Sequence, residues 1–304
     1  MLKEILLQVE KPARYIGNEI NMVKKNPGDV DIRIAFCFPD VYEVGMSHLG
    51  LQILYYFFNR REDTYCERCF APWYDMEEKM RENNIPLFAL ETGDALNKFD
   101  FVAFTLQYEM SYTNIINMLD LAGIPVWSAE RGEDDPIVIA GGPCAYNPEP
   151  LADMIDVFYI GEGEVSYDEF LDLYRNMKKA GCTKAEFLEK CLKIEGIYVP
   201  KFYDVKYKEN GEIESFTPNH PDAPKTIKKV IVKDMDTAFY PDKQLVPLIE
   251  TVHDRVTLEV FRGCIRGCRF CQAGYVYRPV REKSCDKLLG LADSLLKNSG
   301  HEEI

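Results

Sequence analysis

Short apolar runs alternate along the first 180 residues with longer segments in which apolar positions recur three and four residues apart. The short runs end at Gly, Pro, Asn or Asp, as buried strands do, and the longer segments have the period of amphipathic helices. Regular alternation of strand and helix predicts an α/β domain with a parallel sheet covered on both faces. The expected strands are residues 31–38, 65–70, 101–106, 136–140 and 156–160, and the expected helices begin near Ser47 and cover residues 73–83, 112–122 and the segment that ends near residue 179.

The pattern changes after residue 180. Thr183 and Glu186 have the spacing of a capping box and predict the start of a short helix. Residues 196–216 predict a small β-hairpin that turns at Asn210 and Gly211. The expected organisation is an N-terminal helix and loop (1–28), an α/β domain (29–180), a small α+β linker (181–253) and the start of a further domain (254–304).

The last part of the chain predicts one strand over residues 255–261, a loop, a helix over about 283–297, and the beginning of another strand at 302–304. This is a single β/α unit, whereas a β/α barrel needs several more. We therefore expect the sequence to be truncated early in its last domain.

Three cysteines occupy the loop of this unit with the spacing C-x3-C-x2-C: Cys264, Cys268 and Cys271. Thiolates are soft ligands and select iron–sulfur clusters, zinc or copper(I). A structural zinc site usually takes four protein ligands, and His253 is available to complete such a set, with Cys285 as a conceivable fourth thiol. A four-iron cluster held by only three thiolates keeps one iron open to a small molecule.

The C-x3-C-x2-C spacing after a strand, with Phe270 directly before the third cysteine, resembles the cluster motif of the radical SAM superfamily. The resemblance implies that Cys264, Cys268 and Cys271 hold a [4Fe–4S] cluster whose open iron binds S-adenosylmethionine. A reductant such as flavodoxin or ferredoxin would supply the electron that cleaves this cofactor. The resemblance also implies contacts to S-adenosylmethionine from Phe270 and Arg278. Without the rest of the barrel, this chain alone is expected to be inactive.

The loops at the strand ends of the α/β domain resemble those of the flavodoxin-like, cobalamin-binding domain that precedes many radical SAM domains. In that family the first loop reads D-x-H-x-x-G and its histidine ligates cobalt, but here tyrosine takes the histidine position. Phenol is a poor cobalt ligand, so cobalamin binding stays open beside a substrate-recruiting or purely structural role. His48 is expected to be a helix-end or loop residue. The cobalamin contacts that the resemblance implies are Asp40, Tyr42, Gly45, Thr105, Gly141, Gly142, Gly161 and Glu162.

Composition restricts the function further. The chain has 36 basic and 50 acidic residues, a net charge of −14, so this portion is not expected to grip nucleic acid by a broad basic surface. Ten cysteines without a signal peptide predict reduced thiols in a cytoplasmic protein. Cys66 and Cys69 form a C-x2-C pair, but on a strand they point to opposite faces, which favours packing over ligation. No apolar run is long enough to span a membrane.

Two functions are therefore compared. The first is the N-terminal part of a radical SAM enzyme acting on an unknown substrate. If cobalamin binds, its chemistry would be methyl transfer to an unactivated carbon or another radical rearrangement, and otherwise hydrogen abstraction by the adenosyl radical alone. The alternative is a non-catalytic zinc- or thiol-containing protein with a degenerate flavodoxin-like domain. The sequence predicts neither the substrate nor the oligomeric state.

Overall fold

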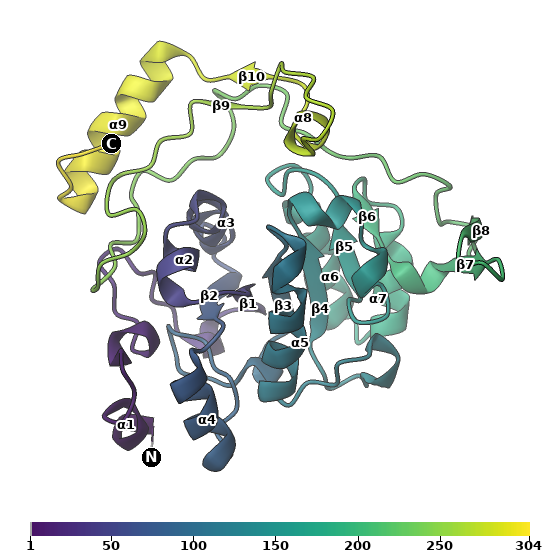
Figure 1. The fold of residues 1–304 in the computed structure, drawn as a ribbon, viewed down its shortest axis with the longest axis horizontal. Helices are drawn as coiled ribbons and strands as arrows, with labels where there is room; N and C mark the ends of the chain where they lie inside the picture. Colours follow the sequence, from purple (N-terminus) through teal and green to yellow (C-terminus); the bar gives the residue numbers. More distant parts are fainter. Residues whose placement is uncertain (1) are drawn as a thin grey trace.

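The centre of the protein is a six-stranded sheet with the order β2-β1-β3-β4-β5-β6, seen in the computed structural model, which describes residues 2–304 (Figure 1). The first five strands in this order are parallel, and β6 runs antiparallel to β5. An α/β fold with a mostly parallel sheet is thus confirmed, and the order 2-1-3-4-5 is that of flavodoxin-like folds. The strands are β1 (Ile32–Phe38), β2 (Thr64–Phe70), β3 (Phe101–Thr105), β4 (Ile137–Gly141), β5 (Val157–Tyr159) and β6 (Ile197–Tyr198).

Helices cover both faces of the sheet. On one face α3 contacts α6 through Phe58 and Tyr167, and α6 contacts α7 through Phe170 and Phe187. On the other face Arg81 of α4 bonds to Asp120 and Asn117 of α5. The helices are α1 (Leu2–Leu6), α2 (Tyr42–Met46), α3 (Leu49–Asn59), α4 (Tyr74–Glu82), α5 (Tyr112–Leu121), α6 (Tyr167–Lys179), α7 (Lys184–Cys191), α8 (Ala273–Val276) and α9 (Cys285–Ser299).

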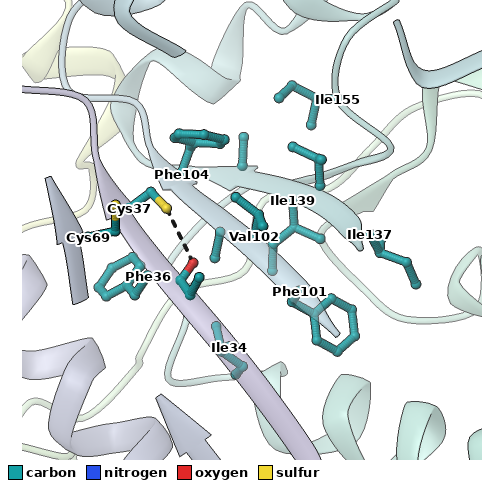
Figure 2. Packing of buried hydrophobic residues seen from close by; sticks show 14 of the residues in the cluster. Ile34, Phe36, Cys37, Cys69, Phe101, Val102, Phe104, Ile137, Ile139 and Ile155 are labelled. Carbon is teal, nitrogen blue, oxygen red and sulfur yellow. Dashed lines mark hydrogen bonds between the residues drawn. The ribbon is translucent and has the colours of Figure 1, made fainter. Parts of the chain in front are cut away.

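The core lies between the sheet and these helices. Figure 2 shows side chains of neighbouring strands packed together, among them Ile34, Phe36, Phe104 and Ile139, all nearly inaccessible to solvent. Strands buried on both faces read as continuous apolar runs, which is why the periodicity of the sequence located them well. Cys66 and Cys69 are both buried on β2, as packing residues are, and Cys69 lies in register with Cys37 of β1.

The linker differs from its prediction at one point. The expected hairpin is present as β7 (Tyr203–Tyr207) and β8 (Ile213–Pro218), but Ile197 and Tyr198, expected to belong to it, form the edge strand β6 instead. They pair with Tyr159 and Phe158 of β5. The apolar pair is buried there, which the hairpin could not achieve, because most of its side chains are exposed.

The C-terminal segment crosses the carboxyl edge of the sheet, at the top of Figure 1, and ends in α9. The expected helix is confirmed, and it packs on α3 through a small apolar cluster that includes Ile53, Leu291 and Leu295. The expected strand over residues 255–261 is shorter: β9 (Phe261–Arg262) pairs antiparallel with β10 (Arg281–Glu282). Within residues 2–304, the segment 255–260 pairs with no strand. It makes isolated backbone bonds instead: the Val256 amide donates to the Glu303 carbonyl at 3.1 Å, and the Lys283 amide donates to the Val260 carbonyl at 3.0 Å. Within residues 2–304 no helix is long and apolar enough to cross a bilayer.

Acid is expected to remove one identifiable contribution to stability. The carboxylate of Asp63, just before β2, accepts hydrogen bonds from Arg61, Thr64 and Arg175. Burial alone would raise the pKa of Asp63, but these donors outweigh it and lower the pKa to about 2. Because the folded pKa lies below the unfolded value of about 3.9, the stabilisation is complete above pH ~4 and is lost as pH falls toward ~2.

We expect Asp63→Asn to lower the unfolding free energy by about 1–2 kcal/mol near neutral pH, a figure reduced for partial solvent screening. The gap to wild type should close between pH ~4 and ~2 in urea titrations monitored by circular dichroism. Asp134→Asn, at an exposed carboxylate, is the control. A gap that stays constant with pH would contradict the assignment.

Candidate functional site

A cavity of about 440 Å³ lies at the carboxyl edge of the sheet. Its walls come from the ends of β1, β3, β4 and β5, from α3, and from the returning segment around Arg262. Ligands of open α/β sheets bind at this edge, at the point where the strand order reverses. Apolar side chains such as Phe36, Ile53 and Ile139 line the interior, whereas Glu162 and Arg262 add charge to the wall.

Five of the residues predicted to contact cobalamin line this cavity together. Glycine is required at two of them by close backbone contact. Gly142 has φ +107°, and a Cβ there would lie 2.8 Å from the carbonyl oxygen of Leu106. Gly161 has φ +131°, and its Cβ would lie 2.2 Å from the carbonyl oxygen of Val230 in the linker. The five are Thr105, Gly141, Gly142, Gly161 and Glu162.

The other three, Asp40, Tyr42 and Gly45, do not line the cavity. The Tyr42 hydroxyl is buried and donates to Oε1 of Glu19 at 2.9 Å. Burial, and then the Glu19 carboxylate, raise the pKa of Tyr42, so this phenol stays neutral and hydrogen-bonded away from the cavity. Gly45 lets α2 approach β2, because a Cβ there would lie 2.3 Å from the Phe70 ring. Asp40 lines a separate hollow of about 270 Å³.

His48 forms the wall between the two hollows. Its Nδ1 accepts the Leu51 amide at 3.1 Å and caps α3, which confirms the expectation of a helix-end residue. Burial lowers the pKa of His48, although a hydrogen bond with Gln107 partly opposes this. Gln107 in turn donates to Oγ1 of Thr105 at 2.5 Å. Gln107 was not predicted, but its position directly after the apolar run of β3 is a signal that could have found it.

An ion-pair cluster connects the loop after β5 to the strands that flank the cysteines. Arg281 donates to both oxygens of Glu162 at 2.7 Å each. Arg262 bonds to Glu164 at 2.5 Å and to Glu259 at 2.7 Å, and it lies 3.3 Å from Glu162. Burial disfavours the charge on Glu162, but the hydrogen bonds from Arg281 and the Val232 amide, together with the charges of Arg262 and Arg281, outweigh it and lower the pKa of this carboxyl. The sequence did not indicate this cluster.

Lys283, which lies between β10 and α9, completes the cluster. Its side chain is fully buried, and its Nζ donates to Oε2 of Glu259 at 2.7 Å. Burial raises the pKa of Glu259, but hydrogen bonds from Arg262 and Lys283 outweigh this and lower it overall. The pKa values of Glu162 and Glu259 are thus both lowered. The cluster pairs three carboxylates (Glu162, Glu164 and Glu259) with three cations (Arg262, Arg281 and Lys283).

The cysteine loop, residues 263–280, joins β9 to β10 and contains α8. Cys264 and Cys271 are half-buried, Cys268 is exposed, and none of the three is in a disulfide. The Cys271 amide donates to the Cys268 carbonyl at 3.2 Å, which turns the chain between them. Among residues 2–304, no group of three or more His, Cys, Asp or Glu side chains is gathered closely enough to hold a metal ion. The three thiols thus share one loop without converging.

The donor chemistry of this loop nevertheless fits an iron–sulfur cluster. Three free thiols that reach solvent are the ligands such clusters use, and the loop contains glycines that allow it to bend. Phe270 beside the third cysteine is 93% exposed. The guanidinium of Arg278 donates to the Arg266 carbonyl at 3.1 Å and lies over the Tyr275 ring at 5.5 Å. Cys285 begins α9 and is exposed.

Alanine at Gly161 is expected to disturb the cavity wall and the linker together. The added methyl group would meet the Val230 backbone, and the positive φ adds its own strain. We expect an unfolding free energy lower by about 3 kcal/mol, from overpacking and left-handed backbone strain. Denaturant titration measures this loss of stability. The control for backbone strain alone is Gly211→Ala in the exposed hairpin turn, because φ there is +84° but no atom lies within 4 Å of the added Cβ. Equal losses in both variants would contradict the close approach.

Comparison with known proteins gives a family for part of the chain. Residues 50–200 match a model described as "Radical SAM proteins, N-terminal". The uncharacterized protein MJ0966 of Methanocaldococcus jannaschii is 28% identical over 265 residues, which cover 87% of this chain and 46% of that relative. The chain thus spans about half the length of this curated relative. No solved structure matches. The matched residues include most of the strand ends around the cavity, so this part of the chain is similar to the N-terminal region of radical SAM proteins.

Proposed function

We propose that the chain is the N-terminal part of a radical SAM enzyme in which Cys264, Cys268 and Cys271 hold a [4Fe–4S] cluster. The family match over residues 50–200 supports this, and the observation that carries it is the set of three free thiols in one loop. When bound, the cluster supplies the electron that cleaves S-adenosylmethionine to methionine and an adenosyl radical, after receiving it from a reductant of the flavodoxin or ferredoxin class.

The residues around the loop would bind and shield these groups. Phe270 precedes Cys271, and Arg278 donates to the carbonyl of Arg266 within the loop; both side chains are exposed, and we propose that they contact S-adenosylmethionine. The apolar cavity beside the loop would exclude water from a reacting group. The substrate is not proposed, because the rest of a barrel and its loops would select it. Ten free cysteines fit a reducing, cytoplasmic compartment.

Cobalamin is a separate and weaker part of the proposal. The glycine-lined cavity offers Thr105, Gly141, Gly142, Gly161 and Glu162 as contacts. Tyr42 offers no cobalt ligand, because its hydroxyl donates to Glu19. If cobalamin binds, hydroxocobalamin added to the protein should co-elute with it in gel filtration. A colourless protein peak would contradict cobalamin binding without affecting the proposal of an iron–sulfur cluster.

Anaerobic reconstitution with iron and sulfide tests the main proposal. We expect close to four irons and four sulfides per chain, with the broad visible absorption of iron–sulfur charge transfer. Stoichiometric zinc without iron would instead support the non-catalytic zinc protein. Because metal and sulfide analyses do not depend on turnover, the outcome is informative even if this chain alone is inactive.

A further inference from the structure

The two ends of the cysteine loop meet at one place. Arg262 of β9 pairs with Arg281 of β10, and Phe261 pairs with Glu282. Directly after β9, Gly263 has φ +102°, and a Cβ there would lie 2.6 Å from the Pro279 carbonyl oxygen. The two stems of the loop, β9 and β10, therefore touch at its base. Interactions that fix this base also fix the position of the loop that carries the cysteines.

Carboxylates of the sheet domain bind both stems. Glu162 receives the two-pronged hydrogen bond of Arg281, and Glu164 receives Arg262. Charge-assisted, two-pronged pairs of this kind are stronger and more directional than neutral hydrogen bonds. The side chains are mostly shielded from water: Arg281 is 8% exposed, Glu162 14% and Glu164 7%. Shielding makes the loss of one partner costly for the other.

The carboxylates are themselves held in place. Glu162 and Glu164 lie three and five residues after the end of β5, and the Glu162 amide donates to the Val230 carbonyl at 2.9 Å. The Val232 amide donates to Oε2 of Glu162 at 2.7 Å. The acceptors thus belong to a segment fixed by the sheet on one side and by the linker on the other.

We propose that Glu162 and Glu164 are positioning residues for the cysteine loop, which they hold at the mouth of the cavity through Arg281 and Arg262. The importance of the loop rests on the proposed function, but the anchoring is a property of the chain without any metal. Glu162, Glu164 and Arg262 also line the cavity, so the cavity and the loop share part of their walls.

Hydrogen exchange of the metal-free chain, measured by mass spectrometry, tests the anchoring. In Glu162→Gln, amides of residues 263–280 should exchange roughly tenfold faster than in wild type, because a charged hydrogen-bonded pair is lost. Amides of β1 and β3 should be unchanged, which separates loop release from global unfolding. Glu164→Gln should act in the same direction through Arg262.

Glu43→Gln is the matched control. Glu43 also accepts a two-pronged bond from an arginine, Arg14, and the two side chains are 13% and 10% exposed, but neither contacts the cysteine loop. We expect no change in exchange of residues 263–280 in this variant. Unaltered exchange in both Glu162→Gln and Glu164→Gln, or an equal increase in Glu43→Gln, would overturn the proposal.

The midpoint potential of the reconstituted cluster separates positioning from simple charge. Glu162→Gln and Arg281→Gln change the local charge in opposite senses, but both release the same stem. We expect the midpoint potential to shift in the same direction in both variants. Shifts in opposite directions would mean that Glu162 acts on the cluster through its charge and not by positioning the loop. If wild-type protein takes up no cluster, the proposed function fails, while the exchange result still decides the anchoring.

Discussion

Alanine in place of Cys264, Cys268 or Cys271 is expected to abolish assembly of an intact four-iron cluster. Each thiolate binds one iron, and the loop offers no fourth cysteine that could substitute for a missing one. Iron and sulfide contents after anaerobic reconstitution should fall from about four per chain to near zero, and the visible absorption should disappear with them.

Two other cysteines serve as controls for this prediction. Cys285 and Cys182 are exposed, free thiols outside the loop, so they are as open to non-specific iron binding as Cys268. Cys285→Ala and Cys182→Ala should retain the full iron content. A loss of metal in Cys285→Ala equal to that in the loop variants would indicate a closed, four-thiolate site and would favour structural zinc.

Methionine in place of Arg68 is expected to have the largest effect on stability. Arg68 lies on the edge strand β2, and its side chain is completely inaccessible to solvent. It donates to Glu19 at 2.7 Å and to Glu91 at 2.6 Å, both of which are equally buried. Removing the cation leaves two carboxylates in the interior, and the unfolding free energy should fall by about 3–5 kcal/mol.

The two carboxylates respond differently to this environment. Burial alone would raise the pKa of Glu19, but the charge and hydrogen bond of Arg68, together with the hydrogen bond from Tyr42, outweigh it and lower the pKa. For Glu91 burial prevails over Arg68 and the pKa is raised. In Arg68→Met we therefore expect proton uptake on folding near neutral pH, because neither carboxylate can stay charged in the core without its partner.

Urea titration measures the loss in Arg68→Met, and Arg81→Met is its control. Arg81 also pairs with two carboxylates, Glu77 and Asp120, but its side chain is 45% exposed. An exposed ion pair contributes about 0–1 kcal/mol, so this control should stay close to wild type. Similar stabilities for the two variants would show that burial of Arg68 adds nothing.

The sequence predicted the sheet and the edge at which the cavity lies. The strands around Phe36, Phe104 and Ile139 are buried on both faces, so their apolar runs are continuous and carry a strong signal. Strand–helix alternation makes the sheet parallel, and parallel strands end at one edge. That is why Thr105, Gly142 and Glu162, far apart in the chain, could be expected together.

Local pattern was insufficient where a residue depends on a distant partner. Tyr42 matches a ligand position by spacing, but its direction is decided by Glu19, which precedes the sheet. Ile197 and Tyr198 were predicted to belong to a hairpin because the adjacent sequence gives no sign of the strand they pair with. That strand, β5, lies about 40 residues earlier in the chain. The strand expected before Phe261 remained short because a strand requires a neighbour.

The sequence by itself determined the strands, the order of the loops and the three thiols that make this chain a candidate for cluster chemistry. Only the tertiary structure decided what holds those thiols in place, since Glu162 and Arg281 are 119 residues apart and nothing in the sequence pairs one with the other. Apolar periodicity is a local property of the chain, whereas the pairing of buried charges depends on which segments folding brings within hydrogen-bonding distance.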